Sequence, residues 1–331
     1  HLTGDGQNNT FTANHGDDQL FGRGGSDRFN WDAGDGDDQI DGGGGAQDLL
    51  IITATNNIDA AAFDNLPGDV FQFQLAGDSL TASDVEQADV NMLAGADLIA
   101  IQEHAGSIPH LLNVDLGSDN VLDSVIVSGT PVTDSYTAWT SSGNVIEIKR
   151  IGGLELKIMK AEGANGGAQV GIYLGAGSDE LTIQQTLANT AMNVWGGPGN
   201  DEVNVGDRTV NGIQSDMSVD GGVDLDVMNV YDDDDVASNT GSLTLAKLTG
   251  LGTHSGVIYA DLETLNVYLG SGGDAFTIES THNGRTNLDT GAGTDEINVR
   301  SISGQTTLNA GENNDEINLG SAAPNLGGDV N

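Results

Sequence analysis

A nine-residue pattern recurs along the chain and limits what it can fold into. Its clearest copy, at 196–204, reads G-G-P-G-N-D-E-V-N. The glycines allow positive φ angles, so that successive carbonyls turn toward one point, and the aspartate adds an anionic oxygen there. The apolar residue two positions after the aspartate begins a strand whose alternate side chains face inward. The pattern therefore predicts an all-β chain in which a cation-binding turn leads into each core strand.

The copies occur at two spacings. Five close copies fill 4–50, and their aspartate position is occupied by Asn9, Asp18, Asp27, Asp38 and Gln47. Two nine-residue units would form one flattened coil of 18 residues. Six further copies follow at steps of 22, 25, 21 and 20 residues within each group, which suits one turn per whole coil, and their aspartates are Asp179, Asp201, Asp226, Asp274, Asp295 and Asp315.

This pattern resembles the calcium-binding nonapeptide of repeats-in-toxin (hemolysin-type) proteins, which include large bacterial surface and secreted proteins. The resemblance implies a parallel β-roll in which aspartate carboxylates and backbone carbonyls hold Ca²⁺ between stacked turns. It places Asp18 and Asp38 on one edge of the roll, and it places Asn9, Asp27 and Gln47 on the other, with weak binding where the charge is missing. The calcium ligands expected from it are Asp18, Asp27, Asp38, Asp179, Asp201, Asp226, Asp274, Asp295 and Asp315.

We therefore predict a parallel β-solenoid (β-roll or β-helix) with stacked Gly/Asp-rich calcium-binding turns and an irregular insertion. The expected domains are a nonapeptide β-roll at 1–50, the irregular insertion at 51–112, and two solenoid repeats at 113–226 and 227–331. Asp179 and Asp274 are the matching landmarks of the two repeats. Within the insertion, the pattern favours a strand at 71–75 and a helix at 84–101. The array is expected to continue beyond both ends.

The charge restricts the possible partners. With 50 acidic and 10 basic residues the formal net charge is -40, which disfavours nucleic acid and anionic membrane surfaces. Divalent cations would relieve the self-repulsion, so we expect metal binding and folding to be coupled. The absence of cysteine disfavours zinc and iron–sulfur sites, and no apolar run is long enough to span a membrane. We expect an extracellular or cell-surface protein.

Some features have two interpretations. The turn aspartates could bond their own backbone as Asx-turns, but their regular repetition favours calcium over this role and over magnesium. The acidic run 232–235 is interpreted as a solvated loop rather than an additional ion site. A basic cluster within a hairpin across Gly152-Gly153 is interpreted as a salt-bridged face, with a partner-docking patch as the alternative, and it comprises Lys149, Arg150, Lys157 and Lys160.

Catalytic signatures are missing from the sequence. Glu103-His104 lacks the second histidine of a zinc-protease motif, there is no G-x-S-x-G elbow, and the six histidines are scattered. We expect no enzymatic activity, although a carboxylate-based polysaccharide lyase or epimerase site stays open. Threonines do not form the flat ranks that ice binding requires.

The expected function is that of an extracellular, calcium-stabilised structural protein. The chain would be a section of a large adhesin or surface protein, or a fibre subunit that associates end to end through unpaired strand edges. The alternatives are a non-catalytic calcium-binding module of a secreted polysaccharide-acting enzyme, or a module that binds surface glycans through 51–112 or the basic hairpin.

Overall fold

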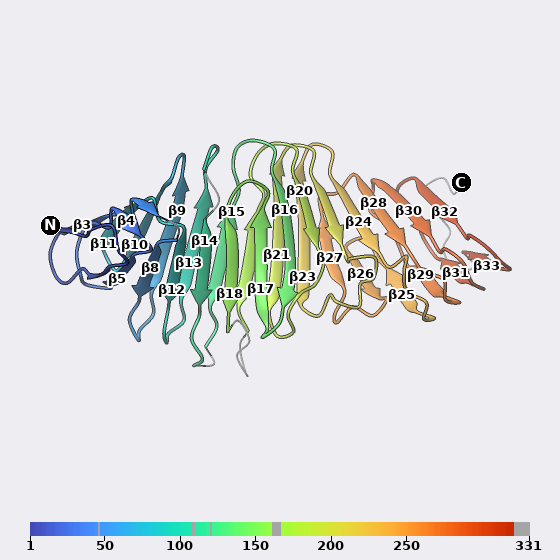
Figure 1. The fold of residues 1–331 in the computed structure, drawn as a ribbon. Helices are drawn as coiled ribbons and strands as arrows, with labels where there is room; N and C mark the ends of the chain where they lie inside the picture. The colour runs from blue at the N-terminus through green and yellow to red at the C-terminus, as the bar shows by residue number, and fades with distance from the viewer. Residues whose placement is uncertain (46, 108–109, 120, 161–166, 321–331) are drawn as a thin grey trace. The chain divides into compact units, whose positions relative to one another are not determined.

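The computed structural model describes residues 1–331 except 46, 108–109, 120, 161–166 and 321–331 (Figure 1). The described residues form strands and turns and contain no helix, and therefore no helical segment that could span a lipid bilayer. The chain divides into an N-terminal unit, His1–Tyr136 with Thr140–Tyr173, and a C-terminal unit, Thr137–Trp139 with Leu174–Asn331. Strand β16 (Ser135–Ser141) supplies residues to both units.

The N-terminal unit consists of two sheets, A1 and B1, which the chain visits in turn. Sheet A1 contains β1 (Leu2–Thr3), β3 (Gln19–Phe21), β6 (Asp38–Asp41), β11 (Asp78–Ser83), β10 (Val70–Leu75), β9 (Ala60–Leu66), β13 (Leu98–Glu103), β15 (Ser124–Ser128) and β19 (Gln169–Tyr173), in spatial order. Sheet B1 contains β2 (Thr10–Thr12), β5 (Arg28–Asp32), β8 (Leu49–Thr53), β12 (Gln87–Asn91), β14 (Leu111–Asp115), β18 (Glu155–Met159) and β17 (Val145–Arg150). A short pair joins β4 (Gly24–Gly25) to β7 (Gly44–Gly45).

The register of the parallel strands builds the core, because residues with the same role in successive coils lie side by side. Along sheet B1 the buried residues Phe11, Phe29, Leu50, Ala88 and Leu112 are successive Cα partners. The Phe11 and Phe29 rings are stacked with their centroids 5.0 Å apart. Every second residue of these strands faces the core, as the alternating sequence predicts.

Residues 51–112 continue these sheets. Strands β8, β12 and β14 are parallel and in register, and Figure 1 shows them side by side. Within this range an antiparallel hairpin, β10 and β11, is inserted between β9 and β6 in sheet A1. The strand expected at 71–75 is confirmed within β10, but the helix expected at 84–101 is wrong. That segment forms β12 and β13, since its buried residues alternate (Ala88 and Val90, then Ile99 and Ile101).

The C-terminal unit also has two sheets, A2 and B2. Sheet A2 contains β21 (Ala191–Pro198), β23 (Asp216–Val223), β27 (Val257–Ala260), β26 (Lys247–Gly250), β25 (Thr240–Leu243), β29 (Ala275–Ile278), β31 (Glu296–Val299) and β33 (Glu316–Leu319), of which β25 to β27 are antiparallel neighbours. Sheet B2 is parallel and contains β20 (Glu180–Ile183), β22 (Glu202–Val205), β24 (Val227–Tyr231), β28 (Thr264–Tyr268), β30 (Arg285–Asp289) and β32 (Thr306–Asn309).

Each predicted step of 20 to 25 residues in this unit corresponds to one coil with a strand in each sheet. The proposed match between Asp179 and Asp274 is wrong, because Asp179 precedes a strand of sheet B2 and Asp274 precedes one of sheet A2. The similar sequence around Asp179 and Asp274 therefore lies at different edges of the coil. The protein is all-β with long parallel sheets, which is compatible with the predicted β-solenoid fold.

The adjacent residues Leu98 and Ile99 distinguish a strand from a helix here. Ile99 is fully buried, whereas Leu98 is 37% exposed. We expect Ile99→Ala to lower the free energy of unfolding by about 2–5 kcal/mol through the cavity it leaves. Leu98→Ala, the matched control, should cost less than about 1 kcal/mol. Urea unfolding followed by circular dichroism measures both, and equal effects of the two substitutions would contradict the assigned register.

Candidate functional site

A carboxylate ladder follows the turns at which strands begin. At each rung, the backbone N–H of one ladder residue donates to the side-chain carboxylate of the equivalent residue in the next coil. Asp179 N donates to Asp201 Oδ1 over 2.9 Å, and Asp201 N donates to Asp226 Oδ1 over 2.9 Å. The carbonyl of the same residue accepts from the next coil, as when Glu202 N bonds Asp179 O at 2.8 Å. Stacked turns are therefore joined directly to one another.

Five such ladders occur in the described part of the chain, and each lies within one unit. The N-terminal unit holds Asn9–Asp27–Asp48–Glu86, Asp18–Asp38 and Asp59–Asp97–Asp123. The C-terminal unit holds Asp179–Asp201–Asp226–Glu263 and Asn239–Asp274–Asp295–Asp315. The donor–acceptor distances of the rungs lie between 2.6 and 3.0 Å.

The second carboxylate oxygen of many ladder residues is the unusual feature. Oδ2 is buried and has no hydrogen-bond partner among the described residues in Asp27, Asp48, Asp97, Asp201, Asp226 and Asp295. Each of these residues is at most 2% exposed. A buried carboxylate oxygen without a partner is costly, so it requires a proton, a water molecule or a cation.

A glycine lies against this oxygen in four turns. A Cβ built on Gly22, Gly42, Gly196 or Gly221 would lie within 3.0 Å both of the ladder aspartate's Oδ2 and of a backbone carbonyl oxygen from the following coil. At Gly196 these atoms are Asp201 Oδ2 and Gly221 O. The first glycine of the pattern is thus required by close approach, whereas the next two, Gly197 and Gly199, are required by their positive φ angles of 104° and 135°. The missing side chain leaves a carboxylate oxygen and a carbonyl oxygen close together.

All nine aspartates predicted as calcium ligands lie on these ladders, and the expected edges hold for Asp18 with Asp38 and for Asn9 with Asp27. The assignment of Gln47 is wrong, because Asp27 N donates to Asp48 Oδ1 at 2.6 Å and Leu50, not Leu49, is the fully buried residue. The glycine run before Asp48 contains one extra residue, which shifts the pattern by one.

Sequence reasoning also missed Asp59, Asp97, Asp123, Glu86 and Glu263. All five precede a buried apolar residue by two positions, as every predicted ligand except Asp315 does, and this spacing is the signal that identifies them. Their turns lack the repeated glycines, so a search centred on glycine does not find them. Two ladder residues accept from a backbone N–H four residues earlier in their own turn, since Thr55 N donates to Asp59 Oδ2 and Asp5 N donates to Asn9 Oδ1. These bonds differ from an Asx-turn, in which the side chain accepts from the N–H two residues later.

Burial raises the pKa of several ladder carboxyls. Desolvation is the largest cause at Asp123 and Asp226, where it raises the pKa to about 6 against the opposing effect of the backbone N–H bond. Neighbouring carboxylates raise these pKa values further. Desolvation also raises the pKa of Asp38, Asp48, Asp97, Asp201 and Asp274. The ladder therefore concentrates negative charge where water solvates it poorly.

The donor set of the ladder fits calcium in kind. It consists only of carboxylate and carbonyl oxygens, the ligands that a hard cation prefers. The described residues contain no group of three or more His, Asp or Glu side chains that could hold a metal ion by themselves. A cation bound here would therefore need backbone carbonyls among its ligands, as the turn pattern predicts.

Residues of the basic hairpin and of the acidic run 232–235 form ion pairs with nearby side chains. The basic hairpin is confirmed as a salt-bridged face for its lysines: β17 and β18 are antiparallel, Lys149 Nζ lies 3.0 Å from Glu155 Oε2, and Lys160 Nζ lies 2.8 Å from Asp115 Oδ2. Arg150 is buried and does not belong to this face. In the acidic run, Asp233 and Asp234 pair with Arg208. Asp232 and Asp235 are buried, which differs from the solvated loop that was expected, and both accept from the side-chain amide of Asn239.

A buried polar network in the N-terminal unit was not predicted. The Arg150 guanidinium lies 3.0 Å from Glu103 Oε2 and 3.1 Å from Asp134 Oδ1, and all three residues are buried. Asn65 connects Glu103 to His110, whose Nε2 lies 3.1 Å from Asp69 Oδ1. Partners distant in sequence meet here because the coils stack, so the spacing of residues could not reveal the network.

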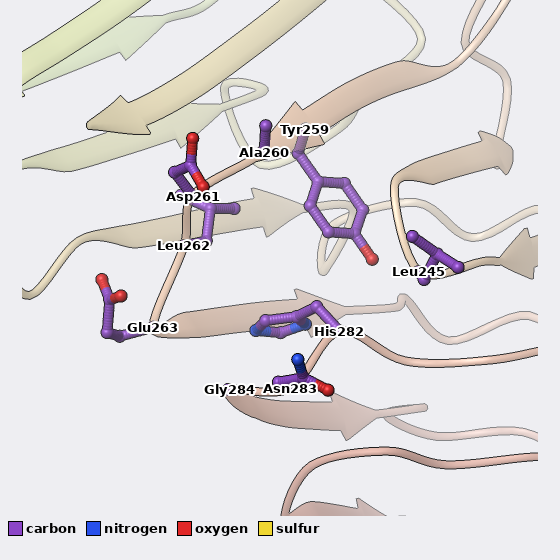
Figure 2. A pocket seen from close by; sticks show the side chains of 9 residues that line it. All are labelled: Leu245, Tyr259, Ala260, Asp261, Leu262, Glu263, His282, Asn283 and Gly284. Atoms are coloured by element: carbon purple, nitrogen blue, oxygen red, sulfur yellow. The ribbon is translucent and has the colours of Figure 1, made fainter. Parts of the chain in front are cut away.

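A hollow of about 450 Å³ lies beside β27 in the C-terminal unit (Figure 2). Tyr259, Glu263 and His282 line it, together with Leu245 and Asn283. The Tyr259 hydroxyl donates to the carbonyl of Thr244, and burial raises the pKa of this phenol. Burial lowers the pKa of His282, whose ring lies edge-on to Tyr259 at a centroid distance of 5.9 Å. The hollow thus combines an imidazole whose pKa is lowered with a phenol that is bonded to the backbone.

Comparison with known proteins places the chain in no family. No family model matches the sequence, and no curated protein matches it. The site must therefore be interpreted from its own geometry.

Gly22 tests the close approach, and Gly6 is its matched control. A Cβ on Gly22 would meet Asp27 Oδ2 and Gly42 O, whereas one on Gly6 would meet nothing within 4 Å, and neither glycine has a positive φ. We expect Gly22→Ala to lower the free energy of unfolding by about 1–3 kcal/mol, while Gly6→Ala should be neutral or stabilising by less than about 1 kcal/mol. Thermal unfolding measures both. A neutral Gly22→Ala would contradict the packing of the ladder.

The raised pKa values predict how stability depends on pH in calcium-free protein. A carboxyl with a raised folded pKa stabilises the fold below its unfolded pKa, and this contribution is lost as the pH rises through the folded value. For Asp123 and Asp226 the window runs from the ordinary value of 3.8 to about 6. We expect the melting temperature in chelator to fall by several degrees across this window. A melting temperature that rises instead would show that these carboxylates are well solvated or paired.

Proposed function

We propose that the chain is an extracellular, calcium-stabilised β-solenoid with a structural or adhesive role, as a section of a large surface protein or as a self-assembling fibre subunit. One observation carries the proposal: successive coils are joined through carboxylates that each use one oxygen for the next coil's backbone, while the second oxygen is buried without a partner in the described structure. The repeats-in-toxin resemblance of the turns supports the choice of calcium.

The ligands proposed for Ca²⁺ are the ladder aspartates and the carbonyls of the glycine turns. Asp201 Oδ2 and Gly221 O, which both face the missing side chain of Gly196, are a representative pair. Bound Ca²⁺ would supply the positive charge that these buried oxygens lack. The aspartates orient their oxygens through the rungs, and the glycines let the carbonyls approach.

Folding and ion binding are coupled in this proposal. At a net charge of -40 the calcium-free chain repels itself, and each closed ladder adds buried negative charge. Extracellular calcium modules bind with dissociation constants on the order of 10⁻⁴ to 10⁻³ M, so the calcium level outside the cell would favour the stacked form. The result is a stiff element whose rigidity serves attachment or assembly.

Asp201→Asn tests this account by separating the hydrogen bond of the rung from the negative charge of the carboxylate. The amide keeps an oxygen for the Asp179 N–H and removes the buried charge, and Asn9 and Asn239 show that the ladders accept asparagine at their ends. We expect this variant to be more stable than the parent in chelator, and to bind calcium at the affected turns about tenfold more weakly, or ~1.4 kcal/mol.

Asp216→Asn is the control, because Asp216 is exposed on β23 and lies on no ladder. Asp216→Asn should change neither the stability in chelator nor the affinity for calcium. Calorimetric calcium titration and thermal unfolding with and without chelator measure both variants. Calcium binding by Asp201→Asn that equals the parent's would remove the ladder from the proposed site.

A further inference from the structure

A second feature lies on the side of sheet B2 that faces away from the core, where Asn204 and Asn229 are buried and Asn266 and Asn287 are partly exposed. The side-chain amides of Asn204, Asn229, Asn266 and Asn287 form a row across four strands, each donating to the oxygen of the one before it at 2.7 to 2.8 Å. Beside this row, the rings of Tyr231 and Tyr268 are stacked at a centroid distance of 5.3 Å and an interplanar angle of 7°. The face therefore carries planar polar groups next to an aromatic stack.

The tyrosine stack ends at a hollow. On the side of Tyr231 away from Tyr268, the neighbouring strand β22 ends at Val205 and the next residue is Gly206, which has no side chain and a positive φ of 95°. The chain turns outward there into Asp207 and Arg208. Tyr231, Gly206, Asp207 and Arg208 line a hollow of about 370 Å³ together with Thr182 and Asn204. This volume falls within the range of about 300–1,000 Å³ that is usual for small-molecule sites.

The groups around the hollow define the ligand chemistry. Tyr231 offers a flat apolar ring, while Asn204, Asp207 and Asp233 offer amide and carboxylate groups. Burial and the neighbouring Tyr268 are the largest causes that raise the pKa of Tyr231, and the carboxylates of Glu202, Asp233 and Glu180 raise it further. The electrostatic potential around the hollow is therefore negative. Arg208 is already paired with Asp233 and Asp234. A polyanionic ligand is therefore disfavoured here.

We propose that this hollow binds a neutral sugar unit of a polysaccharide, with the C–H face of the sugar ring against Tyr231 and its hydroxyl groups bonded to Asp207, Asp233 and Asn204. A pyranose has the required combination of one apolar face and a rim of hydroxyl donors. This site is independent of the ladders and adds a specific ligand class to a structural protein.

The test uses the full chain in calcium-containing buffer and neutral hexasaccharides of glucose, mannose, galactose and N-acetylglucosamine as probes. Saturation-transfer NMR and calorimetry should detect at least one probe with a dissociation constant of about 1 mM or lower. A hexamer of uronic acid should bind at least about tenfold more weakly than that probe, since its charges meet the electronegative rim. No binding of any neutral probe at up to about 10 mM, or equal binding of the acidic hexamer, would overturn the proposal.

Three substitutions locate the binding. Tyr231→Ala should weaken it about tenfold or more, whereas Tyr231→Phe keeps the ring and should stay within about threefold. Asp207→Asn, at an exposed position, should weaken it about threefold. Tyr173→Ala removes an exposed tyrosine of the N-terminal unit and should have no effect. Unchanged binding in both Tyr231→Ala and Asp207→Asn would overturn the assignment of the hollow, whatever the outcome of the calcium experiments.

Discussion

The stacking of the turns depends on carboxylates that use one oxygen to accept a backbone N–H from the adjacent coil. The second oxygen of many of these carboxylates has no hydrogen-bond partner in the described structure. A rung such as Asp201 N to Asp226 Oδ1 fixes the distance and register between coils, and it buries a group whose second oxygen finds no donor among the described residues. An isolated charge in such a place is costly, and these residues repeat along the edge of the sheets. The same feature that aligns the coils therefore makes them dependent on something that neutralises the charge.

The glycine and the aspartate of the repeat act as one unit. The first glycine, such as Gly196, is required because the carboxylate of its own turn and a carbonyl of the next coil lie where a Cβ would be. The following glycines turn the backbone, and the residue two after the aspartate enters the core. Because each role lies at a fixed offset, the repeat sets turn, ladder and core together. Substitution at one offset is expected to disturb the others.

Much of this could be predicted from the sequence where the pattern is regular. The strands that follow Asp18, Asp27 and Asp38 could be predicted from alternation and spacing, and their edges from the repeats-in-toxin resemblance. The prediction fails where an insertion shifts the register, as at Asp48, because one added glycine moves every later residue by one position. It also fails at 84–101, where a stripe compatible with a helix belongs to two short strands, because these segments pair in parallel with strands of the neighbouring coils.

Other features depend on contacts that spacing does not encode. The network of Glu103, Arg150 and Asp134 joins residues from separate coils, and the stack of Tyr231 on Tyr268 follows only from the register of β24 and β28. The sequences around Asp179 and Asp274 are similar, but the two residues lie at different edges of the coil. Similar local sequence therefore does not imply an equivalent position. The local pattern identified the turns and their strands, whereas the strand register of the structure identified which turns and strands are neighbours.

The most direct test of the central claim is a calcium titration of the calcium-free protein at neutral pH. Far-ultraviolet circular dichroism and small-angle X-ray scattering would follow it together, with magnesium as the control ion. The account predicts that calcium, and not magnesium, converts an expanded chain into a compact, strand-rich form. A protein that is already folded in excess chelator at this pH, and that does not respond to calcium, would show that the ladder carboxylates need no cation.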